Sequence, residues 1–399
     1  MSGIAENRRH LLNANFALFL LGFRPFFLLS GIVAVALVAV WIIAYIGGHP
    51  LTTYYGALAW HSHEMLFGYT VAVIAGFLLT AVANWTGIST AEGRPLAALA
   101  TLWASARIVA FFPDSLPHWF ITLVDITFLP ALAMVLAIPL LRARQRHNLI
   151  FLVLLAALAT ANLLMHLEAF KLAVGTATMG AQLAINLILL LIAIIGGRVM
   201  PFFAERALPG VRIKRWLTIE RLSLGSLTLL LIVEFILPES ALVGVLAVLA
   251  AVSHTVRVWG WFTRRVWAVP LLWILYLGYA WMVVGLGLKA LAATGFLSPL
   301  LAIHSFTVGS IGVLTLGMMA RVALGHTGRP LYPTRSMVLA FILINLSACA
   351  RAIVPMAFPS WYIHLLALSG TLWIAAFSIF LYVYTPILIR PRADTDKQS

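Results

Sequence analysis

The amino-acid sequence predicts an all-helical protein that crosses a membrane about twelve times. Of its 399 residues, 63% are hydrophobic and only 10% are charged, and the mean hydropathy is +1.03. Soluble domains are about half apolar and carry about 25% charged residues. The composition therefore excludes a soluble globular protein and predicts one polytopic membrane domain over residues 1–399.

Twelve apolar stretches of the chain are long enough to cross a hydrocarbon core of about 30 Å. In chain order they occupy residues 21–47, 60–86, 96–112, 117–141, 148–171, 178–203, 217–237, 240–262, 269–293, 300–324, 336–358 and 360–389. The third stretch is the shortest. The first is too long for the apolar region of a signal peptide, and no cleavage pattern follows it, so we expect a retained helix.

The positions of the basic residues predict the topology. Most of the 26 Lys and Arg residues lie in or beside segments that share one side of the membrane. They include Arg8, Arg9, Arg142, Arg144, Arg146, the ranges 198–221, 257–265 and 321–335, and the run from Arg390 to Lys397. The positive-inside rule places this side and both termini in the cytoplasm. The net charge of +14 therefore indicates topology and contact with lipid headgroups, not nucleic-acid binding.

An internal repeat relates two distant helices. At an offset of 241 residues, without a gap, the coinciding pairs are His63 with His304, Gly68 with Gly309, Gly76 with Gly317 and Thr86 with Thr327. After a small shift Arg107 coincides with Arg351. We expect three parallel units of four helices over residues 15–145, 146–265 and 266–390, with a degenerate middle unit. This is the layout of the catalytic subunit of heme-copper oxidases, an analogy of fold alone.

Polar side chains gather near the outer ends of several predicted spans. They are His61, His63, Glu64, Arg107, Asp125, His166, Glu168, Glu234, His304 and Arg351. Such groups are costly in lipid and mark either a functional site or internal pairing. His61 and Glu64 lie three residues apart, so a regular helix places them on one face and His63 on another.

The repeated histidines predict a heme site. His63 and His304 lie at one depth on equivalent helices and can bind heme iron from opposite sides. The sequence contains no CxxCH motif, so the predicted heme is a non-covalent heme b. Arg107 and Arg351 suit the heme propionates because a guanidinium pairs well with carboxylates. His61 and His166 are the predicted ligands of a second metal such as copper.

Structural roles are an alternative for the same residues. An intramembrane histidine commonly hydrogen-bonds to a neighbouring helix. Arg107 and Arg351 can likewise form ion pairs with Asp125 and Glu234. On this interpretation the polar residues hold helices together and bind no cofactor.

A membrane transporter is the alternative function. Buried charges and mid-helix glycines are typical of alternating-access carriers; the glycines here are Gly76, Gly196, Gly197 and Gly317. The polar residues would then bind an anionic or metal-bearing solute. The predicted cluster lies in one membrane leaflet, however, whereas carrier sites lie near the midplane. A sensor or scaffold is less favoured because the short loops offer little surface to a soluble partner.

Five motifs are spread over nearly the whole chain. They are GFRPFF at 22–27, WHSHEM at 60–65, NWTG at 84–87, GGRVMPFF at 196–203 and the stretch from His304 to Arg329, which ends in GHTGR. In these motifs the chain resembles the NnrS family of bacterial inner-membrane proteins. The resemblance implies twelve spans, bound heme, copper as a further metal, and a role in the response to nitric oxide in denitrification or nitrosative stress. It leaves open whether the protein is a heme-dependent oxidoreductase acting on nitric oxide, and which protein donates electrons.

Overall fold

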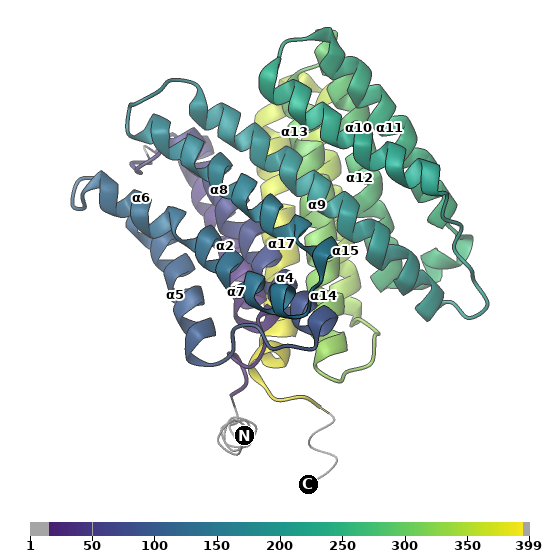
Figure 1. The fold of residues 1–399 in the computed structure, drawn as a ribbon. Coiled ribbons are helices and arrows are strands. Elements are labelled where there is room, and N and C mark those ends of the chain that lie inside the picture. Colours follow the sequence, from purple (N-terminus) through teal and green to yellow (C-terminus); the bar gives the residue numbers. More distant parts are fainter. Residues whose placement is uncertain (1–15, 50, 394–399) are drawn as a thin grey trace. The chain divides into compact units, whose positions relative to one another are not determined.

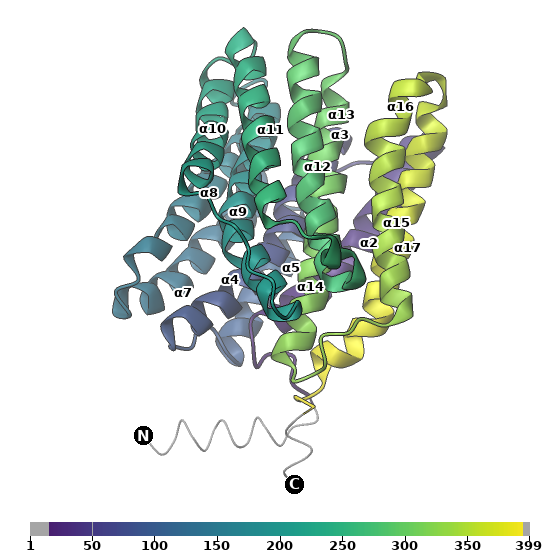
Figure 2. The ribbon, with the colours of Figure 1, turned by 90° about the vertical axis from the view of Figure 1, so that its right-hand side faces the viewer.

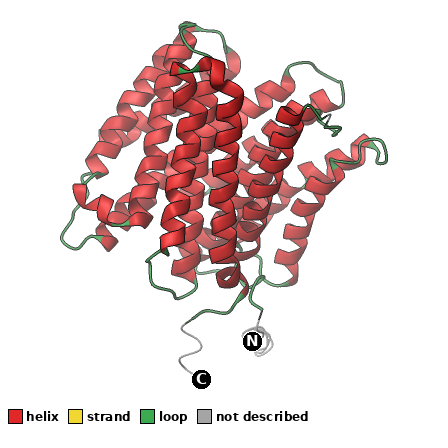
Figure 3. Ribbon diagram, turned by 180° about the vertical axis from the view of Figure 1, so that it is seen from behind, coloured by secondary structure: helices red, strands yellow, loops and turns green. Residues whose placement is uncertain are grey.

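The structure is a computed structural model that describes residues 16–49 and 51–393 (Figure 1). In this part of the chain the regular secondary structure is helical throughout, as Figure 3 shows. A helix satisfies its own backbone N–H and C=O groups, which lipid cannot do. Arg8, Arg9 and Lys397, which entered the predicted topology, lie outside the described residues.

The helices follow the predicted apolar stretches closely. In chain order they are α2 (Phe23–Gly47), α3 (Ala57–His63), η1 (Glu64–Thr70), α4 (Val71–Thr86), α5 (Arg94–Val109), α6 (His118–Ile126), α7 (Phe128–Arg142), η2 (Arg146–Asn148), α8 (Ile150–Ala169), α9 (Thr176–Ala207), α10 (Leu217–Ile236), α11 (Ala241–Trp261), η3 (Arg264–Ala268), α12 (Pro270–Ala293), α13 (Pro299–His304), η4 (Ser305–Gly312), α14 (Val313–His326), α15 (Arg335–Ala348), η5 (Cys349–Ile353), α16 (Val354–Ala357), η6 (Pro359–Trp361) and α17 (Tyr362–Ile389). Several predicted spans consist of consecutive segments, such as α3, η1 and α4.

The described residues form ten helices that are long and apolar enough to cross a membrane. The chain is therefore a multi-pass membrane protein. The predicted number of twelve spans is not confirmed, because α5 and α10 do not meet the same criteria. Helix α5 has only 16 residues. Helix α10 has 20 residues, but it contains Glu220, Arg221 and Glu234, and charged side chains oppose insertion into lipid.

The helices form two compact units. The first unit contains residues 1–181, 319–331 and 377–399, and the second contains residues 182–318 and 332–376. In the first unit, α2 packs on α4, and α7 packs on α8. In the second unit, α11 packs between α10 and α12, and α10 and α11 run side by side in Figure 2. The arrangement in three repeat units remains a prediction.

The first unit joins residues from the two ends of the chain. The buried guanidinium of Arg24 donates hydrogen bonds to the carbonyl oxygens of Leu388 and Arg390, at 2.8 and 2.6 Å. The last carbonyl groups of a helix have no partner within the helix and carry partial negative charge. Arg24 therefore caps the end of α17.

The helices that carry His63 and His304 share an unusual backbone. Helix α3 ends at His63 and continues as the π-helix η1, whereas α13 ends at His304 and continues as the π-helix η4. Both π-helices begin at the residue after the histidine. Such segments are rare and are frequent at functional sites. The repeat seen in the sequence thus extends to local backbone geometry.

The repeated glycines lie where these π-helices contact large side chains. A Cβ atom at Gly309 would lie 2.8 Å from two atoms of the Trp281 indole. A Cβ atom at Gly68 would lie 3.0 Å from Glu64 Oε2 and 3.2 Å from Arg107 Cδ. Gly309 therefore needs a residue without a side chain, whereas a Cβ atom at Gly68 would require small shifts of Glu64 or Arg107.

The Gly309→Ala variant should be less stable than the wild-type protein. The rigid indole of Trp281 has to move, and overpacking of this kind costs about 1–3 kcal/mol of unfolding free energy. The control is Gly287→Ala on α12, where a Cβ would meet nothing within 4 Å. Thermal unfolding in detergent, followed by size-exclusion chromatography, measures both variants. Equal midpoints for the two variants would contradict this account of the packing.

Candidate metal centre

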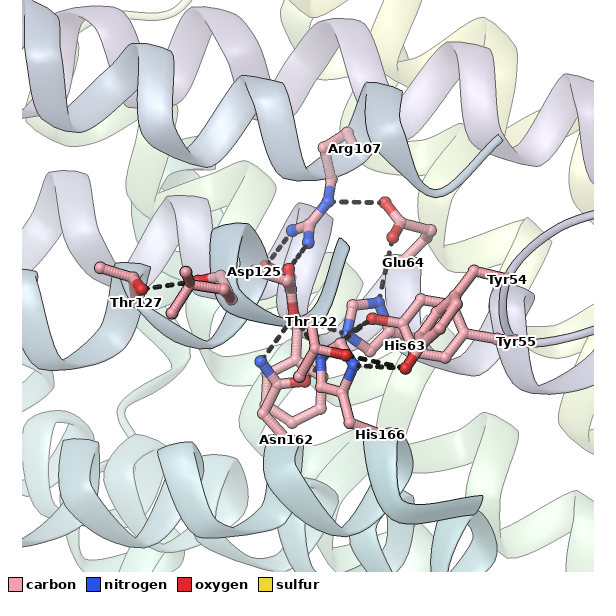
Figure 4. Close-up of polar contacts among 12 residues, drawn as sticks. Tyr54, Tyr55, His63, Glu64, Arg107, Thr122, Asp125, Thr127, Asn162 and His166 are labelled. Carbon is pink, nitrogen blue, oxygen red and sulfur yellow. Dashed lines mark hydrogen bonds and ion pairs between the residues drawn. The ribbon is translucent and has the colours of Figure 1, made fainter. Parts of the chain in front are cut away.

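Four helices of the first unit bring polar side chains together (Figure 4). His63 ends α3, Arg107 lies on α5, Asp125 on α6 and His166 on α8. Helix α6 packs against α5 and α8, and α3 also packs against α8. Tyr55 reaches the same place from the segment that precedes α3. The site is thus built from segments that are far apart in the sequence.

His63, Asp125 and His166 form the centre of the cluster. Asp125 Oδ2 lies 3.1 Å from His63 Nε2 and 3.0 Å from His166 Nε2. The three side chains are almost completely buried, with 0%, 4% and 1% of their surface exposed. Together they form a group that can hold a metal ion, with the ligand atoms all within 4.8 Å of one another.

The spacing of these atoms fits a coordination shell. Imidazole nitrogens and carboxylate oxygens bind transition metals at about 2.0–2.2 Å. Neighbouring ligands of an octahedral ion are then about 3 Å apart, because they subtend a right angle at the metal. The two separations from Asp125 Oδ2, 3.0 and 3.1 Å, agree with this value. Two histidines and one carboxylate are typical ligands of non-heme iron(II), and imidazole also suits copper and zinc.

Glu64 directs the metal-binding nitrogen of His63. Glu64 Oε1 lies 3.0 Å from His63 Nδ1. A carboxylate accepts hydrogen bonds, so this contact puts a proton on Nδ1. Nε2 faces Asp125 Oδ2 and Asn162 Oδ1, which are also acceptors, so a metal ion at this place would take the position of a proton on Nε2. Metal-bound histidines are usually held by such a second hydrogen bond, which fixes the ring and makes it a stronger ligand.

Tyr55 and Asn162 also contact the side chains of His63, Asp125 and His166. The Tyr55 hydroxyl lies 2.9 Å from His63 Nε2 and 3.2 Å from His166 Nε2. Asn162 donates through Nδ2 to Asp125 Oδ2 at 2.7 Å, and its Oδ1 lies 2.9 Å from His63 Nε2. Burial, and secondarily the charge of Asp125, raises the pKa of Tyr55 well above its usual value. At neutral pH Tyr55 is therefore an uncharged hydrogen-bonding phenol.

Arg107 neutralises only part of the negative charge of Glu64 and Asp125. It forms ion pairs with Glu64, at 3.0 Å from Nε to Oε2, and with Asp125 through Nη2. Its Nη1 donates to the Phe67 carbonyl at 2.9 Å. Two carboxylates thus share one guanidinium, and an uncompensated buried charge is costly. The remaining negative charge calls for a proton on a histidine or a bound cation.

The structure brings together His63 and His166, which were predicted as metal ligands, and Arg107, which was predicted at the heme propionates. His61, predicted to pair with His166, instead stacks on the Trp41 ring at 4.4 Å between centroids. Glu64 contacts His63 and Arg107, and the expectation that it shares a helix face with His61 stays a prediction.

The other two predicted heme-site residues lie in the second unit. His304 Nδ1 donates to the Leu300 carbonyl at 2.7 Å, and Arg351 Nη2 donates to the Tyr362 hydroxyl at 3.0 Å. Their segments, α13 and η5, pack against each other. Each unit therefore places a histidine that precedes a π-helix near an arginine-bearing helix. The pairing of His63 with His304 would join the two units and remains a prediction.

Ion pairs with Asp125 and Glu234 were the alternative role expected for Arg107 and Arg351, and the structure confirms this role for Arg107. Arg107 forms an ion pair with Asp125, as the structural interpretation expects. Glu234 is paired with Lys289 and also accepts a hydrogen bond from Asn186 at 2.7 Å. Glu234 is therefore satisfied without Arg351.

Two residues of the site were missed by the sequence analysis. Asn162 lies four residues before His166 on α8, so both side chains lie on one helix face. This spacing could have identified Asn162 from the sequence. Tyr55 lies in a short connecting segment, where no periodicity indicates the direction of a side chain. Asp125 was considered only as the partner of an arginine.

Comparison with known proteins gives one family. Residues 17–392 match the family described as NnrS protein. The comparison with curated proteins found no match. The family match extends over nearly the whole chain and includes every residue of the candidate metal centre. The chain therefore belongs to the NnrS family.

Proposed function

We propose that this chain is a membrane metalloprotein of the bacterial nitric oxide response, in which His63, Asp125 and His166 bind one metal ion. The observation that carries the proposal is the single Asp125 oxygen that faces two buried imidazole nitrogens at 3.0 and 3.1 Å. The family supplies the connection to nitric oxide. We place the protein in the inner membrane with both termini in the cytoplasm, as the distribution of basic residues predicts.

Iron(II) suits the ligand set best. One carboxylate and two imidazoles form the ligand set of non-heme iron enzymes, whereas copper(I) prefers softer sulfur ligands. Copper(II) is the second choice because imidazole also binds it well. When bound, such a metal supplies affinity for nitric oxide and the capacity for one-electron exchange.

The surrounding residues prepare the site for a cation. Glu64 holds the Nδ1 proton of His63, so that Nε2 faces Asp125 and His166. Arg107 holds both carboxylates in place through its fork of N–H groups. The Tyr55 hydroxyl lies close to both Nε2 atoms, so its oxygen would lie beside a metal ion bound there and could serve as a further ligand.

A heme b held by His63 and His304, with Arg107 and Arg351 at its propionates, is a second proposal. The repeated backbone, a histidine followed by a π-helix, favours it. The surroundings of His63 do not fit it: Nδ1 faces Glu64, and Nε2 lies within 3.1 Å of Asp125. An axial bond to heme iron would have to displace these partners. We therefore derive no step through heme at His63.

The His166→Ala variant should lose the metal. Removing one of three ligands should lower the metal content of the purified protein by about tenfold or more. His166 is a better test than Asp125, because loss of the Asp125 carboxylate would also leave Arg107 with a buried unpaired charge. The measurement is iron, copper and zinc per chain by mass spectrometry.

The matched control is His61→Ala, because His61 lies on α3 near the site but stacks on Trp41. Its metal content should equal that of the wild-type protein. Loss of metal in His61→Ala and retention in His166→Ala, at equal folded yield, would reject the proposed ligands. A heme absorption band that disappears in His63→Ala but persists in His166→Ala would instead support the heme proposal.

The Tyr55→Phe variant should keep the fold and bind metal more weakly. Only the hydroxyl oxygen that would lie beside the metal ion is removed, and loss of this contact should cost about tenfold or more in metal affinity. Competition with a chromogenic chelator measures the change. Tyr384→Phe is the control, because Tyr384 is also buried in the first unit but stacks on Phe380, away from the site. Equal affinities of both variants would show that Tyr55 does not support the site.

A further inference from the structure

His166 has a hydrogen-bond partner at the ring nitrogen that does not face Asp125 (Figure 4). His166 Nδ1 lies 3.4 Å from the hydroxyl oxygen of Tyr54, which precedes α3, and this oxygen lies 2.9 Å from Thr122 Oγ1 on α6. Thr122 in turn donates to the His118 carbonyl at 3.0 Å. Tyr54 is buried, Thr122 is half-buried and His118 is exposed. Three consecutive contacts thus connect a proposed metal ligand to the surface of the first unit.

The donors and acceptors of this chain of contacts fit together in one order. The Thr122 hydroxyl has one proton, and a carbonyl oxygen only accepts, so this proton belongs to the contact with His118. Thr122 Oγ1 then accepts from the Tyr54 hydroxyl, whose only proton is used in that contact. The Tyr54 oxygen must therefore accept from His166, which requires a proton on Nδ1. The reverse order would leave Thr122 and the His118 carbonyl facing each other as two acceptors.

His63 and His166 are held in the same way by different partners. Glu64 accepts the Nδ1 proton of His63, and Tyr54 accepts that of His166. Both rings then direct Nε2 toward Asp125 Oδ2, at 3.1 and 3.0 Å. A carboxylate can only accept, whereas a phenol can donate or accept. Tyr54 therefore needs a further partner to fix the direction of its O–H group, and Thr122 supplies it.

We propose that Tyr54 is the positioning residue of His166, and that the Thr122 hydroxyl gives the Tyr54 hydroxyl the direction that this role requires. Tyr54 keeps one proton on Nδ1 and leaves Nε2 as the nitrogen that a metal ion can take. The backbone of Tyr54 is itself fixed, because its N–H donates to the Ala110 carbonyl at 2.9 Å. The metal at His166 rests on the proposed function, whereas the position of the Nδ1 proton does not require a bound metal.

The test locates the proton on His166 directly. Full-length protein with ¹⁵N-labelled histidine is prepared without metal, and the shifts of the ring nitrogens are measured by NMR. The His166 signals are those that are absent from His166→Ala. In the wild-type protein Nδ1 should carry a proton. In Tyr54→Phe the ring loses this acceptor, so the proton should be found on Nε2, beside Asp125 and Tyr55.

Variants of Thr122 separate this role from packing alone. In Thr122→Val the Tyr54 hydroxyl loses its acceptor and turns to donate to His166, so the proton should again be found on Nε2. Thr122→Ser keeps the hydroxyl and should behave like the wild-type protein. Thr127→Val is the matched control, because the Thr127 hydroxyl donates to the Leu123 carbonyl instead. A wild-type ring without a proton on Nδ1, or an Nδ1 proton retained in Tyr54→Phe or in Thr122→Val, would overturn the proposal.

Metal affinity provides a second measurement. Tyr54→Phe and Thr122→Val should bind metal about tenfold more weakly than the wild-type protein, whereas Thr122→Ser and Thr127→Val should bind it equally well. Competition with a chromogenic chelator measures the four variants, and equal affinities in all of them would contradict the proposed role. A wild-type protein that takes up no metal, but whose His166 proton moves in Tyr54→Phe, would reject the metal centre and leave the role of Tyr54 in place.

Discussion

The buried carboxylate of Asp125 is the constraint on which the first unit depends. In an apolar interior a carboxylate must be paired and hydrogen-bonded, because its transfer from water is costly. Oδ1 of Asp125 is paired with Arg107, and Oδ2 is surrounded by His63, Asn162 and His166. These partners come from α3, α5 and α8. One charge on α6 thus fixes the positions of three other helices and orients both imidazoles.

The two units differ in how their carboxylates are paired with cations, and the difference supports the proposed metal centre. In the second unit Glu220 is paired with Arg257, and Glu234 is paired with Lys289, so each of these carboxylates has its own cation. In the first unit Glu64 and Asp125 share Arg107. The excess negative charge lies beside two imidazole nitrogens, where a metal cation would neutralise it. Ion pairs in which each carboxylate has its own cation are typical of structural roles. A cluster with two carboxylates and one arginine is instead suited to binding a cation.

The sequence predicts the helices well and the contacts poorly, for physical reasons. Apolar length is set by the bilayer, so the predicted stretch 21–47 agrees with α2 (Phe23–Gly47). The cost of polar groups in lipid singled out His63, Arg107 and His166 as candidates. Which candidates meet depends on packing between helices, which the sequence pattern does not contain. The π-helix that begins at Glu64 is a further feature that a regular helical spacing does not predict.

The most direct test of the proposed metal centre is anomalous X-ray diffraction from the purified protein, measured at the iron and copper absorption edges. A peak should lie within about 2.2 Å of His63 Nε2, Asp125 Oδ2 and His166 Nε2. A metal bound elsewhere in the chain, with no peak beside these three side chains, would contradict the account. So would a heme plane bound to His63.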